Sequence, residues 1–165
     1  MKIPTSTKLK AIALAVTMLV GVEGLSTKAY KDTGGVWTIC YGETKGVTQG
    51  MTATKQQCWT MLQSEAEATL VAIAPYLPAT SIPACYPNPN QYAALVSFCY
   101  NVGVYNCKTS TLFKYINKGD YVAAQKEFGR WIYVKKADCR LAASNCSGIP
   151  KRRAAEATLW AKPST

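Results

Sequence analysis

An unbroken apolar run, residues 11–22, restricts the fold of this chain more than any other feature of its sequence. Lys2, Lys8 and Lys10 precede the run, and Glu23 follows it directly. A basic flank followed by about a dozen apolar residues is typical of a signal peptide. As a helix the run would be about 18 Å long, well short of the roughly 30 Å hydrocarbon core of a bilayer. The run therefore predicts a helix whose residence in a membrane is marginal.

Three interpretations of this run compete. The first is a buried first helix, apolar on every side because the fold encloses it. The second is a cleaved signal peptide, although cleavage near Gly21 would remove the segment that positions Glu23, and no Ala-x-Ala site precedes it. The third is a signal-anchor that exports the protein, holds it loosely at the membrane and later releases it. A released segment could then become the buried helix, so the first and third interpretations are compatible.

The composition is that of a globular protein with a basic surface. Of 165 residues, 48% are hydrophobic and 17% are charged, which excludes a disordered chain and is enough for one domain with its own core. The formal net charge of +10 favours an anionic partner. The sequence has no helix-turn-helix, zinc-finger or RNP-like pattern, so we rank a polyanionic cell envelope above nucleic acid. We expect a monomer.

The cysteines indicate an oxidising compartment. Seven are present, at positions 40, 58, 85, 99, 107, 139 and 146, and none belongs to a Cys-x-x-Cys pair. The chain has no histidine, so no metal site is expected and disulfides are the better explanation. We predict Cys139 with Cys146, which enclose a short loop, and Cys40 with Cys58. An odd number leaves one cysteine over, and Cys99, on an apolar helical face, is the candidate for a buried thiol.

Two carboxylates and a hydroxyl follow the apolar run at short spacing. Glu23 closes the run, Asp32 stands nine residues later in a turn-prone Lys-Asp-Thr-Gly-Gly stretch, and Thr38 stands six further on in a β-prone stretch. A carboxyl beside apolar surface tends to hold its proton, whereas one in a polar turn stays ionised. Glycoside hydrolysis uses such a pair, one as acid for the leaving oxygen and one as base for water. Spacing alone leaves open that both are solvated surface residues.

These residues belong to a longer pattern that resembles the phage-type lysozymes, the muralytic endolysins of tailed phages. That family carries Glu-Gly-Leu, then Asp, then Thr-Ile-Gly-x-Gly, and this chain has Glu23, Asp32 and Thr38 at the matching spacings. The resemblance continues through residues 97–103, 110–112, 129–131 and 151–156. Cys40 departs from the family's usual glycine. Glu43 stands where many members carry histidine, so any role of that histidine is absent here or taken by Glu43.

The resemblance implies an α+β, mostly helical fold, with a small β-containing lobe and a larger helical lobe in residues 23–165, and residues 1–22 as signal-anchor or first helix. It implies hydrolysis of the β-1,4 bond between N-acetylmuramic acid and N-acetylglucosamine in peptidoglycan, without a cofactor. Glu23 would be the general acid, Asp32 the base, and Thr38 would orient the attacking water, which predicts inversion at the anomeric carbon. A lytic transglycosylase, a chitinase or an inactive wall-binding protein on the same fold remain alternatives.

Four further residues are candidates for binding or supporting the substrate. Arg152 aligns with the arginine that pairs with the catalytic glutamate in the family, while a solvated basic helix face is the alternative. Asn101 and Gly103 match a segment that lines the family's cleft, although turn or core packing would also explain them. Tyr41 could stack on a sugar, but the hydrophobic core is the commoner place for an aromatic residue in a strand.

The resemblance also bears on the N-terminal run. Several endolysins of lambdoid phages that resemble this chain carry a release element directly before the catalytic glutamate, so we favour the signal-anchor interpretation. It places the protein at the host inner membrane, contacted transiently through residues 9–22, and then in the periplasm, where peptidoglycan is the partner. The number of cysteines agrees with export.

Local patterns predict the helices that follow. Thr54-x-x-Gln57 is a capping box that opens a long helix, and Pro75 ends it. Asp120 is the expected N-cap of another. Helices are expected over residues 91–102, 109–117 and 121–128 and from Pro150 onward, and loops over residues 44–51 and 83–89.

Overall fold

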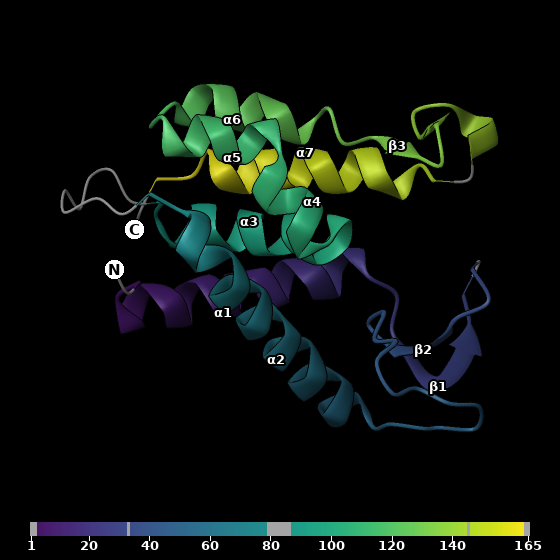
Figure 1. Ribbon diagram of the computed structural model, residues 1–165. Coiled ribbons are helices and arrows are strands. Elements are labelled where there is room, and N and C mark those ends of the chain that lie inside the picture. The colour runs from purple at the N-terminus through teal and green to yellow at the C-terminus, as the bar shows by residue number, and fades with distance from the viewer. Residues whose placement is uncertain (1–2, 33, 79–86, 145, 164–165) are drawn as a thin grey trace.

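The computed structural model describes residues 3–32, 34–78, 87–144 and 146–163. Helices predominate over two small antiparallel sheets (Figure 1), which confirms the predicted α+β, mostly helical class. The elements in chain order are α1 (Thr5–Val22), β1 (Ser26–Lys31), β2 (Trp37–Cys40), α2 (Lys55–Ile73), η1 (Ala74–Tyr76), α3 (Pro89–Val102), α4 (Val104–Thr109), α5 (Thr111–Asn117), α6 (Tyr121–Phe128), β3 (Tyr133–Val134), β4 (Ala137–Asp138), η3 (Ala142–Ser144) and α7 (Gly148–Trp160).

Strands β1 and β2 form the small lobe at one end of the molecule, just beyond the C-terminal end of α1 (Figure 1). They pair antiparallel, with Tyr30 opposite Thr38 and Lys31 opposite Trp37. The chain then returns along β1, where Lys28 bridges to Thr52, and enters α2. Helix α2 connects this lobe to the helical lobe. Because Ser26 pairs with Cys40, it is the end of β2, and not the turn, that lies beside the start of β1, just after α1.

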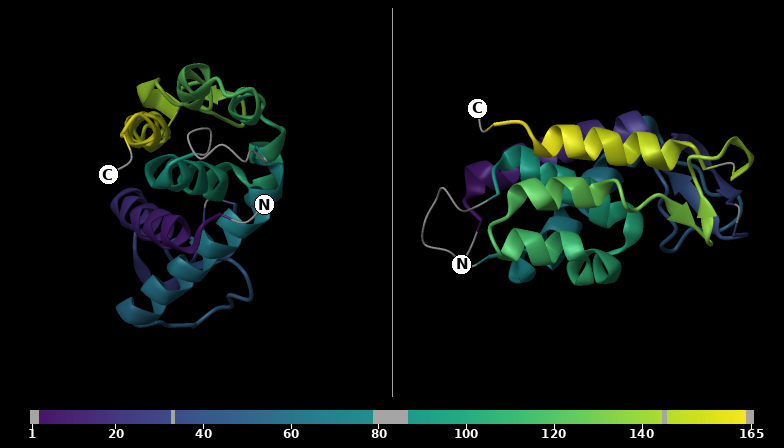
Figure 2. Two further views of the ribbon diagram at one scale, coloured as in Figure 1. Left: turned by 90° about the vertical axis from the view of Figure 1, so that its left-hand side faces the viewer. Right: turned by 90° about the horizontal axis from the view of Figure 1, so that it is seen from above.

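Helix α3 is the centre of the larger lobe. Its residues 92–99 are all buried, as expected of a helix that is covered on every side. Helices α1, α2, α4 and α7 all contact it, and Figure 2 shows it between α1 and α7. Phe98 packs edge-on against Phe128 of α6 and Trp131, with ring centroids 5.5 Å and 5.3 Å apart. The first and last helices of the chain, α1 and α7, therefore both pack on the buried helix α3.

The helix starts follow the local signals of the sequence. The amide of Gln57 donates to the Thr54 hydroxyl at 3.1 Å and the Thr54 amide donates to the Gln57 side chain at 2.7 Å, which confirms the capping box of α2. The amide of Ala123 donates to the Asp120 carboxylate at 2.9 Å, so Asp120 is the N-cap of α6 as predicted.

Three predicted boundaries are wrong. The last helix begins at Gly148 and not at Pro150, which lies in its first turn. Residues 109–117 do not form one helix, because Ser110 ends α4 and caps α5 by accepting the Phe113 amide at 3.3 Å. Pro89 does not belong to a loop but is the first residue of α3, where its missing N–H costs nothing, and Asn88 before it forms a second capping box with Gln91. The rest of the expected 83–89 loop, residues 83–86, lies outside the described residues.

Helix α1 is longer and less enclosed than the sequence suggested. It has 18 residues, and among the described residues it is the one helix with the length and mean hydropathy of a membrane span. It is therefore about 27 Å long rather than about 18 Å. One face is buried against α2 and α3, whereas Leu9 is 63% exposed and Val20 is 39% exposed. The expectation of a first helix enclosed on every side is wrong. The buried stripe is Ala11, Ile12, Ala15, Val16 and Leu19.

Three disulfides join described residues: Cys40–Cys58, Cys99–Cys107 and Cys139–Cys146. The first joins β2 to α2 and the third closes the loop before α7, and both are pairs that the sequence favours. The second corrects the prediction of a buried free thiol. Cys99 is buried, but it bonds to Cys107 across the bend at Gly103 between α3 and α4. Cys85 lies outside the described residues.

Cys40 adopts a left-handed backbone conformation, with φ of +59°. Glycine is favoured in that region, which explains why the resembling family usually carries glycine at this position. A side chain there costs about 1–2 kcal/mol. The disulfide to Cys58 closes a separation of 18 residues. A loop of that size contributes about 3 kcal/mol to stability, which exceeds the cost of the conformation.

We expect the double variant Cys40→Ala, Cys58→Ala to lose about 3 kcal/mol of unfolding free energy, because the unfolded chain regains the entropy that the cross-link removed. The matched variant Cys40→Gly, Cys58→Ala loses the same bond but relieves the left-handed conformation, so it should be about 1 kcal/mol more stable than the alanine version. Urea unfolding of the three proteins measures both differences. An alanine version as stable as the glycine version would contradict this account of Cys40.

Candidate active site

Glu23 stands at the junction of the two lobes. It is the C-cap of α1, where its amide donates to the Leu19 carbonyl at 2.8 Å and the backbone leaves the helix in an extended conformation. Its side chain is 24% exposed and forms an ion pair with Nη1 of Arg152 on α7. The pairing of these two residues that the resemblance implied is present in the structure. The carboxyl is thus held by the helical lobe and faces partly to solvent.

Arg152 is buried, with 4% of its surface exposed, and it is not part of a solvated helix face. Its Nη2 donates to the Ser97 carbonyl at 2.9 Å, and its Nε donates to the Glu156 carboxylate at 3.2 Å. The Ser97 hydroxyl donates to the same carboxylate oxygen at 2.7 Å. Because each arm of the guanidinium has its own acceptor, the orientation that Arg152 presents to Glu23 is fixed.

Arg153 extends this buried network toward the end of α3. Its Nη2 donates to the Asn101 side chain at 2.6 Å, and its Nη1 lies 3.1 Å from Oε2 of Glu156 in an ion pair. Its guanidinium also lies 4.9 Å from the Phe98 ring centroid. Burial lowers the pKa of Arg153 to about 10, against the opposing charge of Glu156, and burial raises the pKa of Glu156. Asn101 therefore anchors the end of α3 to α7.

Asp32 lies in the turn between β1 and β2. Its Oδ1 accepts the amides of Gly34 at 2.8 Å and Val36 at 2.9 Å. The Asp32 amide donates to the Val36 carbonyl, also at 2.9 Å, which closes the turn. A side chain that bonds to the amide two residues on is the reason that aspartate favours such turns. Hydrogen bonds to one of its oxygens thereby fix the carboxylate in the turn of the hairpin.

Thr38 lies in β2, and its side chain is 3% exposed. Its hydroxyl donates to the Val36 carbonyl at 3.1 Å, so Thr38 and Asp32 share Val36 as a partner. Antiparallel pairing places Thr38 opposite Tyr30 of β1. The hydroxyl is therefore held inside the small lobe, on the strand that follows the Asp32 turn.

The remaining residues that the resemblance singled out have structural roles of their own. Tyr41 is 8% exposed and belongs to the core, with its carbonyl accepting the Tyr100 hydroxyl at 2.9 Å. Gly103 has a φ of +83° and separates α3 from α4, a backbone conformation that suits glycine. Glu43 pairs with Ile39 through both backbone groups, and its carboxylate accepts the Lys45 amide at 2.7 Å. Nothing in these contacts gives Glu43 the role of a histidine.

Sequence reasoning missed Ser97, Tyr100, Arg153 and Glu156 as parts of this site. A signal for two of them existed, since Arg152 and Arg153 stand four and three residues before Glu156, spacings that bring helix side chains together. Charged residues on a helix are normally read as solvated, and only the tertiary contact with Ser97 reveals the burial. Tyr100 carries no sequence signal that separates it from a core aromatic.

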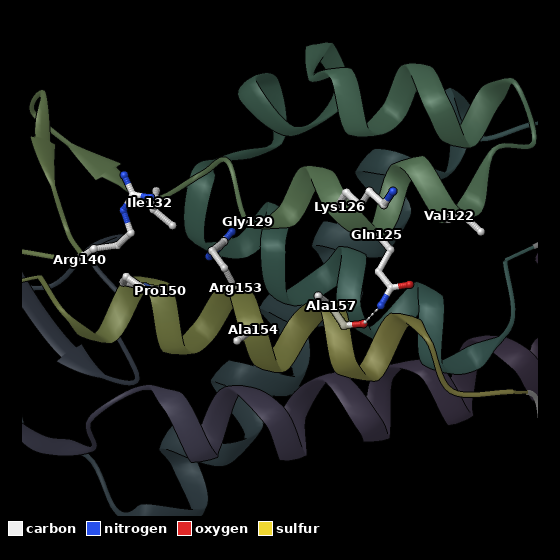
Figure 3. A pocket seen from close by; sticks show the side chains of 10 residues that line it. All are labelled: Val122, Gln125, Lys126, Gly129, Ile132, Arg140, Pro150, Arg153, Ala154 and Ala157. Carbon is white, nitrogen blue, oxygen red and sulfur yellow. Dashed lines mark hydrogen bonds between the residues drawn. The ribbon is translucent and has the colours of Figure 1, made fainter.

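Two cavities of the helical lobe are lined by none of Glu23, Asp32 and Thr38, although Arg153 lines the first. One of about 530 Å³ lies between α6 and α7 (Figure 3), and its lining includes Lys126 and Arg140 but no carboxylate. Arg140 is already paired with Asp138, at 2.5 Å. The other, of about 330 Å³, includes Glu127 and Arg130, which pair with each other at 3.2 Å. Among the described residues, no group of three histidine, cysteine or acidic side chains could hold a metal.

Comparisons with known proteins cover the whole site. A family model described as Phage lysozyme matches residues 20–156, a segment that contains Glu23, Asp32, Thr38 and Arg152. The SAR-endolysin of Enterobacteria phage PA-2 is 39% identical over 130 residues, which are 74% of this chain and 75% of that protein.

Solved structures agree with the family match. The muramidase domain of SpmX from Asticaccaulis excentricus has a TM-score of 0.76 at 26% identity and covers 90% of this chain and 95% of that chain. An endolysin from Escherichia coli O157:H7 phage FAHEc1 has a TM-score of 0.73 at 27% identity, covering 90% and 91%. The fold is thus similar to that of a muramidase domain and of an endolysin over 90% of this chain, and the sequence is similar to that of the PA-2 protein over 74% of it.

Proposed function

Because the chain belongs to the phage lysozyme family, we propose that it is an endolysin that hydrolyses the β-1,4 bond between N-acetylmuramic acid and N-acetylglucosamine in host peptidoglycan. The observation that carries the proposal is the ion pair between Glu23 and the buried Arg152. It fixes a partly exposed carboxyl at the end of α1, directly before the hairpin that bears a second, hydrogen-bonded carboxylate. Most glycoside hydrolases use such a pair of carboxylates.

We assign the proton transfers as follows. Glu23 donates its proton to the glycosidic oxygen, so that N-acetylglucosamine leaves with a free 4-hydroxyl. Asp32 takes a proton from water as the water oxygen bonds to the anomeric carbon of N-acetylmuramic acid. Both bonds described for the Asp32 carboxylate end on Oδ1, which leaves Oδ2 as the oxygen we assign to that water. Thr38 helps to orient the water. Attack opposite the leaving group inverts the anomeric carbon.

Purified protein tests the proposal on isolated peptidoglycan. We expect the turbidity of a peptidoglycan suspension to fall as the glycan strands are cut. Folded wild-type protein that leaves the turbidity unchanged would contradict the proposed function, and would favour the alternative of a wall-binding protein without activity.

Replacement of Asp32 by asparagine should lower the rate of clearing by about tenfold or more, because asparagine keeps the acceptor oxygen of the turn but cannot take a proton from water. Binding to the wall should be unchanged. Proton NMR of early wild-type products on a soluble glycan should show the anomer opposite to that of the substrate linkage. Retained configuration would contradict the role assigned to Asp32 and Thr38.

We also propose that residues 1–22 act first as a signal-anchor in the host inner membrane and later as the first helix of the folded enzyme in the periplasm. The name SAR-endolysin of the relatives and the length and hydropathy of α1 support this. Leu9 and Val20 are apolar side chains that the folded protein leaves exposed. A helix that also enters lipid needs apolar side chains on this face. The partner is then peptidoglycan, with transient contact to the membrane.

Thr17 provides a test of the two states of α1, because it is exposed on the folded helix and lies within the apolar run. Thr17→Lys should leave clearing by the folded protein unchanged but reduce its recovery in the membrane fraction. A lysine within a spanning helix costs about 2.5–3.5 kcal/mol. Wild-type protein should move, uncleaved, from the membrane to the periplasmic fraction when an uncoupler collapses the membrane potential.

Thr60→Lys is the matched control. Thr60 is also an exposed helical threonine, and both hydroxyls donate to the carbonyl four residues before them. This variant should fractionate as wild type. A wild-type protein that is soluble throughout, or whose mature chain starts after Gly21, would contradict the signal-anchor proposal.

A further inference from the structure

A hydrogen bond from a side chain of the helical lobe to the backbone of the small lobe joins the two lobes. The Tyr100 hydroxyl, on α3, donates to the Tyr41 carbonyl at 2.9 Å. Tyr41 immediately follows β2, the strand that bears Thr38. Tyr100 lies three residues after Ser97, which accepts a hydrogen bond from Arg152. The bond therefore connects the helix that supports the Glu23 partner with the strand of the hairpin.

Disulfides restrain both ends of this bond. Cys40, the residue before Tyr41, is bonded to Cys58 of α2, and Cys99, the residue before Tyr100, is bonded to Cys107 of α4. Tyr41 and Tyr100 are thus each one residue away from a disulfide. Neither end can shift along its own element without moving a cross-link.

The backbone around Tyr41 is shaped for this contact. Cys40 and Gly42, on either side of it, both have positive φ, +59° and +97°. A Cβ added at Gly42 would lie 3.9 Å from the Tyr100 hydroxyl, so the turn packs directly against that hydroxyl. Two left-handed residues around one carbonyl are unusual outside tight turns, and here they accompany the carbonyl that accepts from Tyr100.

The surroundings keep the tyrosine a donor. Burial raises the pKa of Tyr100, and the negative charges of Glu23, Glu43 and Glu65 raise it further, while Arg152 acts in the opposite direction. Its hydroxyl therefore stays protonated at the pH of the periplasm. Glu23 and Arg152 are thus among the charges that act on this hydroxyl.

We propose that Tyr100 is a positioning residue, whose hydrogen bond to the Tyr41 carbonyl sets the distance between the Glu23 carboxyl on the helical lobe and the Asp32–Thr38 hairpin. The inference rests on the proposed function, since it requires that the two lobes contribute to one reaction. Small displacements of reacting groups are costly: about 1 Å can lower a rate by roughly a hundredfold. In this role Tyr100 acts through the Tyr41 carbonyl and not on the substrate.

The test compares Tyr100→Phe with Tyr105→Phe. Tyr105 lies on α4 and is 72% exposed, so its variant makes the same chemical change without breaking an interlobe bond. For Tyr100→Phe on a soluble glycan we expect kcat, counted per folded molecule, to fall about tenfold with KM within about twofold of wild type. Tyr105→Phe should match wild type in both.

Amide hydrogen exchange gives a second readout that general destabilisation would not produce. In Tyr100→Phe, residues 38–43 should exchange at least about tenfold faster, while α5, α6 and α7 keep wild-type rates. Unchanged kcat and unchanged exchange at residues 38–43 would overturn the inference. If wild type cuts peptidoglycan and Glu23→Gln does not, that outcome removes the role of Tyr100 alone; an inactive wild type removes the proposed function instead.

Discussion

Peptidoglycan clearing is expected to fall by roughly 10²- to 10⁴-fold when Glu23 is replaced by glutamine, because the leaving oxygen then has no proton donor. Glutamine has nearly the size and shape of glutamate and keeps an oxygen that can accept from Arg152. The protein should therefore remain folded, with the circular dichroism spectrum of wild type. Turbidity measured over a range of protein concentrations gives the loss.

Glu67→Gln is the control for this variant. Glu67 is 50% exposed on α2 and pairs with Lys8 of α1, so its replacement removes a carboxyl without touching the site. It should clear peptidoglycan like wild type. Clearing by folded Glu23→Gln at the wild-type rate would falsify the assignment of the general acid.

Replacement of Arg152 by methionine is expected to lower the unfolding free energy by about 3 kcal/mol. Removal of one member of a buried ionic network leaves the others without compensation. Glu156 is fully buried and would keep only Arg153 as an ionic partner, beside the Ser97 hydroxyl, and Glu23 would lose its ion pair. For a protein of this size the melting temperature should fall by about 6–12 °C. Clearing by the folded fraction should also fall, because the Glu23 carboxyl is no longer held.

Lys151→Met tests whether this effect belongs to the network. Lys151 is exposed on the same turn of α7, and the same substitution there should change the melting temperature by less than about 2 °C. If both variants melted at the same temperature as wild type, Arg152 would contribute no more to stability than an exposed lysine. The account of the buried network would then be wrong.

Sequence patterns predicted the parts of this fold that depend on neighbouring residues. The capping box at Thr54 and the N-cap at Asp120 are both present, because the donor and acceptor lie within one turn. The boundary between α4 and α5 was missed because the apolar spacing continues across Ser110, which caps the second helix only once the chain has turned. The pairing of Cys99 with Cys107 was missed for a similar reason: it depends on the bend at Gly103.

Candidate site residues could be predicted where they belong to a recognisable motif. They could not be predicted where the structure buries charged side chains. Spacing and the family resemblance pointed to Glu23, Asp32 and Thr38, whose roles stay predictions. The resemblance alone pointed to Arg152, whose ion pair with Glu23 the structure contains. Arg153 and Glu156 were not found, because their helical spacing indicates an ion pair but does not show that the pair is buried, and charged residues are rarely buried. The open face of α1 was also missed, since an apolar sequence does not show which of its sides packs.

Product analysis in ¹⁸O-labelled water tests the central claim most directly. Hydrolysis adds one oxygen from water to the anomeric carbon, so each fragment that wild-type protein releases should end in reducing N-acetylmuramic acid with one ¹⁸O, seen by mass spectrometry. Glu23→Gln should release none. Fragments that end in an anhydro sugar without label, or in reducing N-acetylglucosamine, would contradict the account, because water would then not be the nucleophile or the bond cut would be a different one.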